Sequence, residues 1–332
     1  MQASPGAGAP PADERAVCPA CAHADFRLYR EVVSGVREVP DGLDRGAFVH
    51  VRIERCASCG LYRTVHLGDP RTPAQLYEEG SVSFEASASK IGAAGDRSPS
   101  STDELSMLGV APPARLLDVG CGAGAFLSRA ARAGYEASGI DLDPKAVAFA
   151  RDRLGLSVQR MSLEELPQSE RYDVITMLGV LEHIPEPARF LSWARERLAD
   201  GGEVLIGVPH AGSLNRLVSR LSRDEWDMFL EPGHLYHYDV RTLGMLAARA
   251  GLTPRRWATG TMTIRGKLPF LPFRSAPLER RLRGLVASYE VVRRAYGGAL
   301  RLLDAVRAGD MLFATFVPEG REAQPAQSQD AA

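Results

Sequence analysis

Residues 116–127, Leu-Leu-Asp-Val-Gly-Cys-Gly-Ala-Gly-Ala-Phe-Leu, constrain the fold of this chain more than any other segment. An apolar run with the character of a buried strand leads into three glycines at alternate positions, and a helical stretch follows. Glycine has no Cβ, so the backbone can turn sharply there and approach a ligand closely. The free N–H groups at the start of the helix favour an anionic group. The segment therefore predicts a ligand-binding turn of a parallel α/β sheet.

Two cofactors fit this turn. Gly120, Gly122 and Ala125 satisfy the dinucleotide fingerprint, and Asp141 follows about 20 residues on, where an acid binds the ribose. Asp118 favours the other cofactor, S-adenosylmethionine. A carboxylate inside the loop motif can face a cationic amino group, whereas it would repel a pyrophosphate.

Two later segments support the second cofactor. Residues 172–177 read Tyr-Asp-Val-Ile-Thr-Met and precede Leu-Glu-His-Ile-Pro at 181–185, and residues 198–206 read Leu-Ala-Asp-Gly-Gly-Glu-Val-Leu-Ile. This ordered set resembles the class I S-adenosylmethionine-dependent methyltransferases, especially the broad bacterial group with the Leu-Glu-His-Ile-Pro stretch. The resemblance covers about residues 112–260 and a strand near 310–317. It implies methyl transfer, and a nicotinamide enzyme or a catalytically inactive relative are the alternatives.

Short apolar runs alternate with amphipathic stretches along this core, which predicts an α/β fold with a sheet covered on both faces. The fold that we expect is Rossmann-like, with the seven-stranded sheet of class I methyltransferases and a helical insertion before the last strand. Strands are expected near 115–119, 136–140, 157–161, 172–178, 203–208, 254–260 and 310–317, the last one antiparallel. Helices are expected near 125–133, 144–154, 187–199 and 240–250.

The resemblance implies roles for residues around the cofactor. Asp118 should face the methionine amino end, Asp141 should bind the ribose, and Leu142 should flank the adenine. Ser162 ends the third strand, where family members contact the adenine edge, although many relatives have Asp at this position. Cys121 lies in the loop and is expected mainly to pack. The predicted cofactor-binding residues are Asp118, Gly120, Cys121, Gly122, Gly124, Asp141, Leu142, Ser162 and Leu163.

Four of the five cysteines form two C-x-x-C pairs, Cys18 with Cys21 and Cys56 with Cys59. Each pair aims two sulfurs at one point, and two pairs complete a tetrahedral thiolate set for zinc. In a reducing compartment this spacing favours metal over disulfides, and a redox pair or reduced structural cysteines are the alternatives. Residues 48–53 alternate like a strand, so we expect a small zinc ribbon over about 15–70. Its structural zinc would replace the core that so small a unit lacks.

Four histidines near strand ends are candidate proton acceptors, because histidine titrates near neutrality. They are His183, His210, His234 and His237. Residues 234–239 resemble a stretch of the zinc-containing sugar C-methyltransferases, a family that also has a two-knuckle ribbon. In that family the residue that matches His234 acts as the base. The family's Tyr-His-Glu before it is replaced here by residues 231–233, Glu-Pro-Gly, so we favour O-methylation over C-methylation.

A second possible metal site involves Glu182 and His183. In ubiquinone-pathway O-methyltransferases an E-x-x-E-H stretch can hold a divalent ion, but Gly179 stands here in place of the first acid. One carboxylate and one imidazole make a poor metal site. We therefore expect His183 to orient the substrate or to fix its loop.

The balance of basic and acidic residues limits the kinds of partner that the chain can bind. The chain of 332 residues has 40 basic and 41 acidic residues, so general binding of polyanions is not expected. Zinc ribbons also occur in ribosomal RNA methyltransferases, but residues 12–70 have eight Arg and no Lys against nine acidic residues, which makes nucleic acid an unlikely partner. Residues 264–308 have ten basic and three acidic residues. They can cap the core, or contact a phosphate-bearing substrate or an anionic membrane surface.

The sequence thus divides into a disordered tail at 1–14, a zinc ribbon at 15–70, a linker or lid at 71–110, a core at 111–262 and 309–318, a basic amphipathic insertion at 263–308 and a tail at 319–332. No apolar run of membrane-spanning length and no signal peptide are found, which predicts a cytoplasmic protein. The expected activity is methylation of a sugar, nucleotide-sugar or secondary-metabolite hydroxyl, with His234 as the base. A zinc-ribbon RNA methyltransferase and a non-catalytic S-adenosylmethionine-binding protein that recruits a partner are the alternatives. The oligomeric state is left open.

Overall fold

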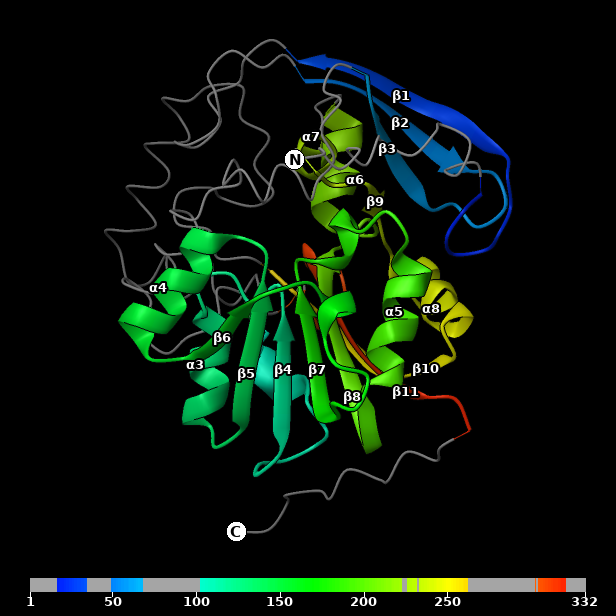
Figure 1. Ribbon diagram of the computed structural model, residues 1–332. Helices are drawn as coiled ribbons and strands as arrows, with labels where there is room; N and C mark the ends of the chain where they lie inside the picture. Colours follow the sequence, from blue (N-terminus) through cyan, green and yellow to red (C-terminus); the bar gives the residue numbers. More distant parts are fainter. Residues whose placement is uncertain are drawn as a thin grey trace, which may run out of the picture.

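The computed structural model describes residues 17–34, 49–67, 102–222, 226–231, 233–261, 302 and 304–320. A seven-stranded sheet with helices forms the centre of the structure. A four-stranded antiparallel sheet lies beyond the ends of the strands of this central sheet (Figure 1). The tail expected at 1–14, residues 321–332 of the tail expected at 319–332, the segment 71–101 and most of the basic insertion, 263–301, lie outside the described residues. Within these residues, no helix has the length and hydropathy needed to cross a membrane.

The central sheet confirms the predicted Rossmann-like fold with seven strands. Six strands point in the same direction, and the last strand of the chain is inserted antiparallel to them near one edge, as expected. In spatial order the strands are β10 (Leu252–Gly260), β11 (Met311–Pro318), β8 (Leu198–Pro209), β7 (Tyr172–Leu178), β4 (Arg115–Val119), β5 (Glu136–Asp141) and β6 (Ser157–Arg160).

Helices cover both faces of this sheet, because alternate strand residues point to opposite sides. Leu116 and Val174 pack with residues of α3 and α4, whereas Leu117 and Ile175 pack in the cluster that contains α5 and α8. The predicted helices are present as α3 (Ala125–Arg132), α4 (Pro144–Leu154), α5 (Pro187–Glu196) and α8 (Val240–Arg249).

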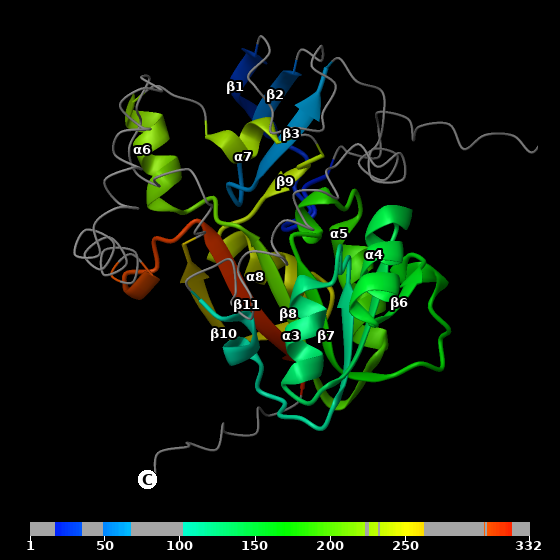
Figure 2. The same cartoon turned by 90° about the vertical axis from the view of Figure 1, so that its left-hand side faces the viewer.

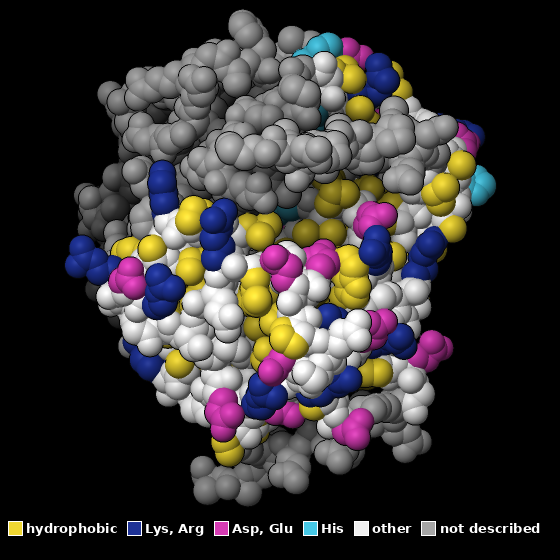
Figure 3. Space-filling model, viewed as in Figure 1, with side chains coloured by type: hydrophobic (Ala, Val, Ile, Leu, Met, Phe, Trp, Pro, Cys, Tyr) yellow, Lys and Arg dark blue, Asp and Glu magenta, His cyan; other side chains and the backbone are white. Residues whose placement is uncertain are grey.

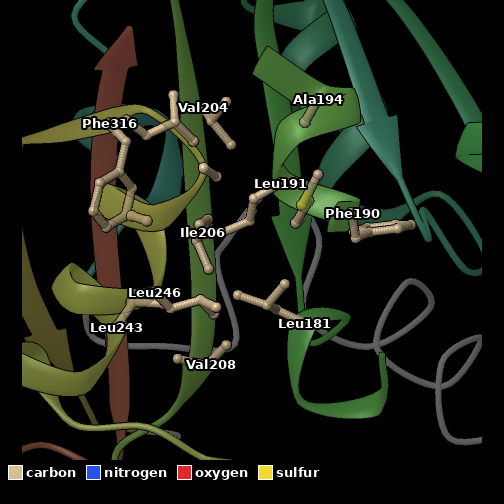
Figure 4. Close-up of a cluster of buried hydrophobic side chains, with 14 of the residues drawn as sticks. Leu181, Phe190, Leu191, Ala194, Val204, Ile206, Val208, Leu243, Leu246 and Phe316 are labelled. Atoms are coloured by element: carbon tan, nitrogen blue, oxygen red, sulfur yellow. The ribbon is translucent and has the colours of Figure 1, made fainter. Parts of the chain in front are cut away.

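The larger core cluster lies between β8 and the helices α5 and α8. Leu181 and Leu191 point toward Ile206 and Leu246 across this interface, and all four side chains are fully buried (Figure 4). Large aliphatic side chains in this setting each contribute about 1.5–3 kcal/mol from burial. This packing fixes the segment after β7, which contains the short 3₁₀ helix η3 (Leu181–His183).

One boundary differs from the prediction. The helix expected to reach residue 199 ends at Glu196, and β8 begins at Leu198 instead of residue 203. Leu198 pairs with Tyr172, and the register then shifts before Glu203 pairs with Val174. Gly201 has a φ of 83° within this bulge, a conformation that glycine adopts without strain.

The four-stranded sheet is flanked by the two cysteine pairs, one before β1 and one at the turn between β2 and β3, and has the features expected of a zinc ribbon. It is built from β1 (Phe26–Ser34), β2 (Val49–Cys56), β3 (Tyr62–His66) and β9 (Tyr236–His237). The sequence did not predict β9, which comes from the segment between β8 and α8 and pairs with β3. Its two residues connect the ribbon to the core, and the two views agree in placing β9 between them (Figures 1 and 2).

Ribbon and core also share a hydrophobic cluster. Cys18, Cys59 and Leu61 are buried in the same cluster as Leu235 and the α8 residue Leu243. At this interface the Arg241 guanidinium donates a hydrogen bond to the carbonyl of Cys59. The ribbon is therefore packed on the core and is not an isolated domain.

Residues 102–110, which the sequence placed in the linker, also pack on the core. They include the 3₁₀ helix η1 (Glu104–Met107). Arg129 of α3 is 8% exposed, and its guanidinium lies 2.5 Å from Asp103 Oδ1 and 2.8 Å from Glu104 Oε2. Glu203 of β8 accepts hydrogen bonds from the backbone N–H groups of residues 109 and 110. Helices α6 (Leu214–Ser222) and α7 (Asp227–Leu230) and the 3₁₀ helix η2 (Leu163–Glu165) were not predicted.

Candidate cofactor and acceptor site

The glycine loop, residues 120–124, leaves β4 at the carboxyl edge of the sheet and leads into α3. Gly120, Gly122 and Gly124 have φ angles of 68°, 52° and 86°, so all three lie in the left-handed region that favours glycine. A Cβ on Gly120 would lie 2.5 Å from Val180 Cγ2, and one on Gly124 would lie 2.6 Å from Leu156 Cδ1. The loop therefore needs glycine at these positions both for its backbone conformation and for space.

Asp118 ends β4 beneath this loop. It is 2% exposed, and its Oδ1 accepts a hydrogen bond of 2.6 Å from the Thr176 hydroxyl. Burial raises the pKa of this carboxyl to about 7, and the hydrogen bond from Thr176 partly opposes the rise. A cationic group placed beside Asp118 would restore its charge, which is the property required of a partner for an amino group.

Asp141 ends the neighbouring strand, β5. Its Oδ2 accepts a hydrogen bond of 2.7 Å from the N–H of Gly122, and its Oδ1 accepts one of 2.8 Å from the N–H of Asp143. Each carboxylate oxygen can accept a second hydrogen bond, so the side chain is oriented but still able to bind the hydroxyls of a ribose. Burial is the main cause that raises the pKa of Asp141.

The other predicted cofactor residues lie around the same edge. Cys121 packs at the back of the loop, where its Sγ would be 2.8 Å from a Cβ on Gly139, so its packing role agrees with the sequence interpretation. Leu142 follows β5, and its carbonyl accepts a hydrogen bond from Arg160. Ser162 caps η2, with its N–H donating to Glu165, while Leu163 is buried in the core cluster. The buried position of Leu163 makes a packing role the better description of this residue.

The four-cysteine cluster brings both C-x-x-C pairs together. Sγ atoms of Cys18 and Cys59 lie 3.5 Å apart, and those of Cys21 and Cys56 lie 3.6 Å apart. All four sulfurs lie within 4.8 Å of one another, and none is in a disulfide. Four ligands at 2.3 Å from a tetrahedral zinc ion lie about 3.8 Å apart. The observed separations fit this geometry.

The thiols of this cluster need a cation if they are to ionise together. Burial raises the pKa of Cys18 to about 11 and raises the pKa of Cys59 still further. Thiolates this close repel one another unless a metal ion neutralises them. The donor set is therefore compatible with zinc, which binds thiolates.

Three of the four predicted histidines form a second cluster, which we name the histidine cluster: His183, His234 and His237. The rings of His183 and His234 are 4.7 Å apart between centroids, and those of His234 and His237 are 6.1 Å apart. The cluster lies where η3, the segment before β9, and β3 meet. It therefore sits on the ribbon side of the carboxyl edge of the sheet.

Burial sets the charge state of these imidazoles. It lowers the pKa of His183 to about 4 and that of His237 to about 3, and it lowers the pKa of His234 well below its usual value. All three are therefore neutral near pH 7, and neutral imidazoles can accept a proton or bind a metal ion. Phe229 and Trp226 pack edge-on or tilted against His237 and help to keep the cluster dry.

His210 lies apart from this cluster. It follows β8, and its Nδ1 is 3.1 Å from the carbonyl of Gly309, so the ring donates to the backbone there. A Cβ on Gly212 would lie 2.6 Å from its Nε2. The structure therefore places His210 in a turn that holds β8 and β11 together, and it does not support a catalytic role.

Sequence reasoning missed two partners of the histidine cluster. Glu182 was paired only with His183, but the structure brings His234 to the same point, so that a carboxylate and two imidazoles lie within 4.8 Å of one another. Thr64 of β3 forms a 2.8 Å hydrogen bond with His237 Nε2. No pattern in the sequence predicts the contact between Thr64 and His237, because this contact depends on the pairing of β3 with β9, a strand far away in the chain.

The surface near this edge differs from the rest of the face shown in Figure 3. Hydrophobic side chains gather across the middle of this face, at the level of the carboxyl ends of the strands, and charged side chains border them. An apolar surface beside buried polar groups is typical of sites that bind small molecules.

Comparison with known proteins also indicates a methyltransferase. Residues 96–256 match the family model described as "Methyltransferase domain". The chain is 29% identical to the ubiquinone biosynthesis O-methyltransferase of Alkalilimnicola ehrlichii over 42% of its own length and 64% of the relative, and 37% identical to that of Nitrosococcus oceani over 38% and 57%. It thus spans less than two thirds of the length of these two relatives.

Solved structures with a similar fold include the cyclopropane synthase MmaA2 from Mycobacterium tuberculosis, with a TM-score of 0.42 at 21% identity over 64% of this chain and 80% of that one. An S-adenosylmethionine-dependent methyltransferase from Mesorhizobium loti gives a TM-score of 0.42 at 19% identity over 64% and 94%.

The sheet order, the glycine loop and the family match define the core as an S-adenosylmethionine-dependent methyltransferase domain. Over this domain the chain is similar to ubiquinone biosynthesis O-methyltransferases, and the ribbon lies outside the matched residues.

Proposed function

We propose that this protein transfers the methyl group of S-adenosylmethionine to a hydroxyl group of a small molecule. The observation that carries the proposal is the arrangement at the carboxyl edge. A glycine loop in the left-handed conformation lies between the buried carboxyl group of Asp118 and the half-buried one of Asp141, and a neutral histidine cluster lies on the ribbon side of the same edge. In parallel α/β sheets ligands bind at this edge.

The carboxyl groups divide the cofactor between them. Asp118 would face the methionine ammonium group, Asp141 would accept both ribose hydroxyls, and the loop would contact the methionine end through its backbone. The acceptor oxygen attacks the methyl carbon in line with the sulfur. The O–C bond forms as the S–C bond breaks, the sulfonium becomes a neutral thioether, and the hydroxyl proton must leave. Alignment of donor and acceptor supplies most of the rate increase in such a displacement.

The acceptor is proposed to be a sugar, a nucleotide-linked sugar or a secondary metabolite with a free hydroxyl. The relatives that the chain matches are ubiquinone biosynthesis O-methyltransferases, which supports oxygen as the acceptor atom. The histidine cluster supports it too, because transfer to a hydroxyl needs a nearby group that takes up the proton, and an imidazole can accept one.

We further infer that the four-cysteine cluster holds one structural Zn²⁺ ion, with Cys18, Cys21, Cys56 and Cys59 as its ligands. The ion would supply folding energy to the ribbon and no step of the reaction. The distances between the sulfurs support this inference.

The test is transfer from isotope-labelled S-adenosylmethionine to a panel of sugars, nucleotide-sugars and phenolic or aliphatic alcohols, followed by mass analysis of the products. His234→Ala should keep the affinity for S-adenosylhomocysteine and lose turnover. His50→Ala, which removes an exposed imidazole on β2, is the matched control and should keep both. Cofactor binding without transfer to any acceptor would replace the proposal by a non-catalytic binding role.

A further inference from the structure

Glu182, His183 and His234 come together from two segments that are 50 residues apart in the chain. Glu182 and His183 lie in η3 after β7, and His234 lies just before β9. The N–H of Leu235 donates a 2.7 Å hydrogen bond to the carbonyl of Glu182, which fixes the two segments side by side. One ligand atom from each side chain lies within 4.8 Å of the other two.

Both imidazoles are held by the backbone in the same way. His183 Nδ1 lies 3.0 Å from the carbonyl of Gly233, and His234 Nδ1 lies 3.2 Å from the carbonyl of Met228. A carbonyl can only accept, so each Nδ1 carries the hydrogen and each Nε2 presents a lone pair. Histidines that ligate metals are oriented in this way, by donating their other N–H to a carbonyl or a carboxylate.

Glu182 supplies an independent observation. It is 3% exposed, and its Oε2 has no hydrogen-bond partner among the described residues. No described Lys or Arg lies within ion-pair distance of it. A buried carboxyl group without a partner costs free energy, and such groups are normally paired or bind a cation.

We propose that Glu182, His183 and His234 bind a divalent transition-metal ion, such as Zn²⁺ or Mn²⁺, in a site separate from the four-cysteine cluster. Two imidazoles and one carboxylate are a common donor set for such ions, and three protein ligands leave at least one coordination position open. Ligand atoms at 2.0–2.2 Å from a metal ion lie about 3–4 Å from one another, so side-chain rotations that move these atoms by about 1 Å would complete the site.

The open position suits an oxygen of the acceptor, and this part of the inference rests on the proposed methyl transfer. A bound ion would lower the pKa of a coordinated hydroxyl, so that the acceptor could release its proton to solvent as it enters the site and present the oxygen to the methyl carbon. In this arrangement His234 acts as a ligand, which replaces the role of base that the sequence suggested. His234 adds a third donor to Glu182 and His183, the pair that the sequence alone suggested.

Cobalt substitution tests the site without any acceptor. The full-length protein, refolded or exchanged with Co²⁺ alone, should bind two equivalents of cobalt. One gives the strong thiolate-to-cobalt charge-transfer band of the cysteine cluster, and the other gives only weaker d–d bands. Glu182→Gln, His234→Ala and His183→Ala should each lose the second equivalent and its bands and keep the thiolate band. His210→Ala, a buried histidine outside the cluster, should keep both equivalents.

The thiolate band and the affinity for S-adenosylhomocysteine report whether each variant is folded, so a folding failure is recognised. One equivalent of cobalt in the wild-type protein, with the thiolate band alone, would overturn the inference. So would two equivalents that persist in Glu182→Gln, His183→Ala and His234→Ala alike. The outcome is independent of methyl transfer: cobalt binding in a protein that methylates nothing would refute the proposed function and leave the metal site standing.

Discussion

The proposed cofactor side and the proposed acceptor side of this site are built in opposite ways. The cofactor side is local: residues 118–124 and one carboxylate from the next strand supply it, and much of it is backbone. The acceptor side is assembled from η3, the segment before β9, β9 itself and β3, and it consists of buried and half-buried side chains. A site of the first kind depends on backbone conformation, and one of the second kind depends on the packing of distant segments.

The ribbon belongs to the second kind of construction. It contributes Thr64 to the histidine cluster, and the core contributes β9 to the sheet of the ribbon. Changes in the ribbon should therefore reach the acceptor side and leave the cofactor side nearly unaffected. The predictions below test this contrast in order of decreasing effect.

Loss of one cysteine ligand should have the largest effect. Cys56→Ser should remove the zinc, which supplies about 10 kcal/mol or more of folding free energy in small zinc domains. Turnover should fall below detection, hydrogen exchange should rise in residues 49–67 and 226–237, and S-adenosylhomocysteine should still bind in calorimetry. Cys121→Ser, outside the cluster, should keep its zinc. Equal loss of cofactor binding in Cys56→Ser would show that the two sides are not separable.

A Cβ in the glycine loop should act only on the cofactor side. Gly120→Ala places a methyl group 2.5 Å from Val180 Cγ2 at a φ of 68°, and strain of this kind costs about 1–3 kcal/mol. We expect the affinity for S-adenosylhomocysteine to fall by about 10- to 100-fold, with unchanged metal content.

Gly155→Ala is the matched control for this substitution. Gly155 has a φ of 67° at the end of α4, but nothing lies within 4 Å of an added Cβ. It should lower the stability by about 1 kcal/mol and leave the cofactor affinity unchanged. Equal losses of affinity in both variants would mean that the loop tolerates the contact with Val180.

The hydrogen bond between ribbon and histidine cluster should have a smaller effect. Thr64→Val removes the 2.8 Å bond to His237 Nε2, and His237 Nδ1 already has no partner among the described residues. The unsatisfied imidazole should cost about 1–3 kcal/mol of unfolding free energy, measured as a shift of the urea midpoint. Thr64→Ser, which keeps a hydroxyl, should recover most of it. An unchanged midpoint in Thr64→Val would contradict the coupling of β3 to the cluster.

The smallest effect concerns the protonation of Asp118. Its pKa of about 7 in the folded protein lies above the unfolded value, so the folded state binds more protons between about pH 4 and pH 7. The contribution of Asp118 to stability is therefore present below pH 4 and is lost as the pH rises to about 7. Asp118→Asn should remove this slope.

Binding of the cofactor ammonium group should reverse the shift and release a proton from Asp118 near pH 6.5. Calorimetry of S-adenosylhomocysteine in two buffers of different ionisation enthalpy measures this release. Asp118→Asn should abolish it. Proton uptake in the wild-type protein would place the ammonium group elsewhere.

The local side of the molecule was predictable from the sequence, and the assembled side was only partly so. The strand, loop and helix around Gly122 are recognisable because their residues are contiguous and each glycine is required by its backbone angle. The start of β8 was missed because a bulge at Gly201 lets the strand continue through polar residues that resemble a turn.

On the assembled side the sequence suggested the histidines but not their arrangement. The approach of His234 to Glu182 depends on the bond between Leu235 and the carbonyl of Glu182, for which no sequence spacing gives a signal. The separation of His210 depends likewise on its contact with the turn at Gly309. Two-residue strands such as β9 carry no periodic pattern, so a pairing of this length escapes prediction.

Strand β9 has a consequence for anyone who wishes to move the ribbon to another protein. The ribbon's sheet runs through β3 to residues 236 and 237, so an excised piece that stops at residue 67 exposes the open edge of β3. Such an edge invites association with other chains. A graft that retains its native neighbour must include that short strand, so the smallest transplantable unit is discontinuous in the gene.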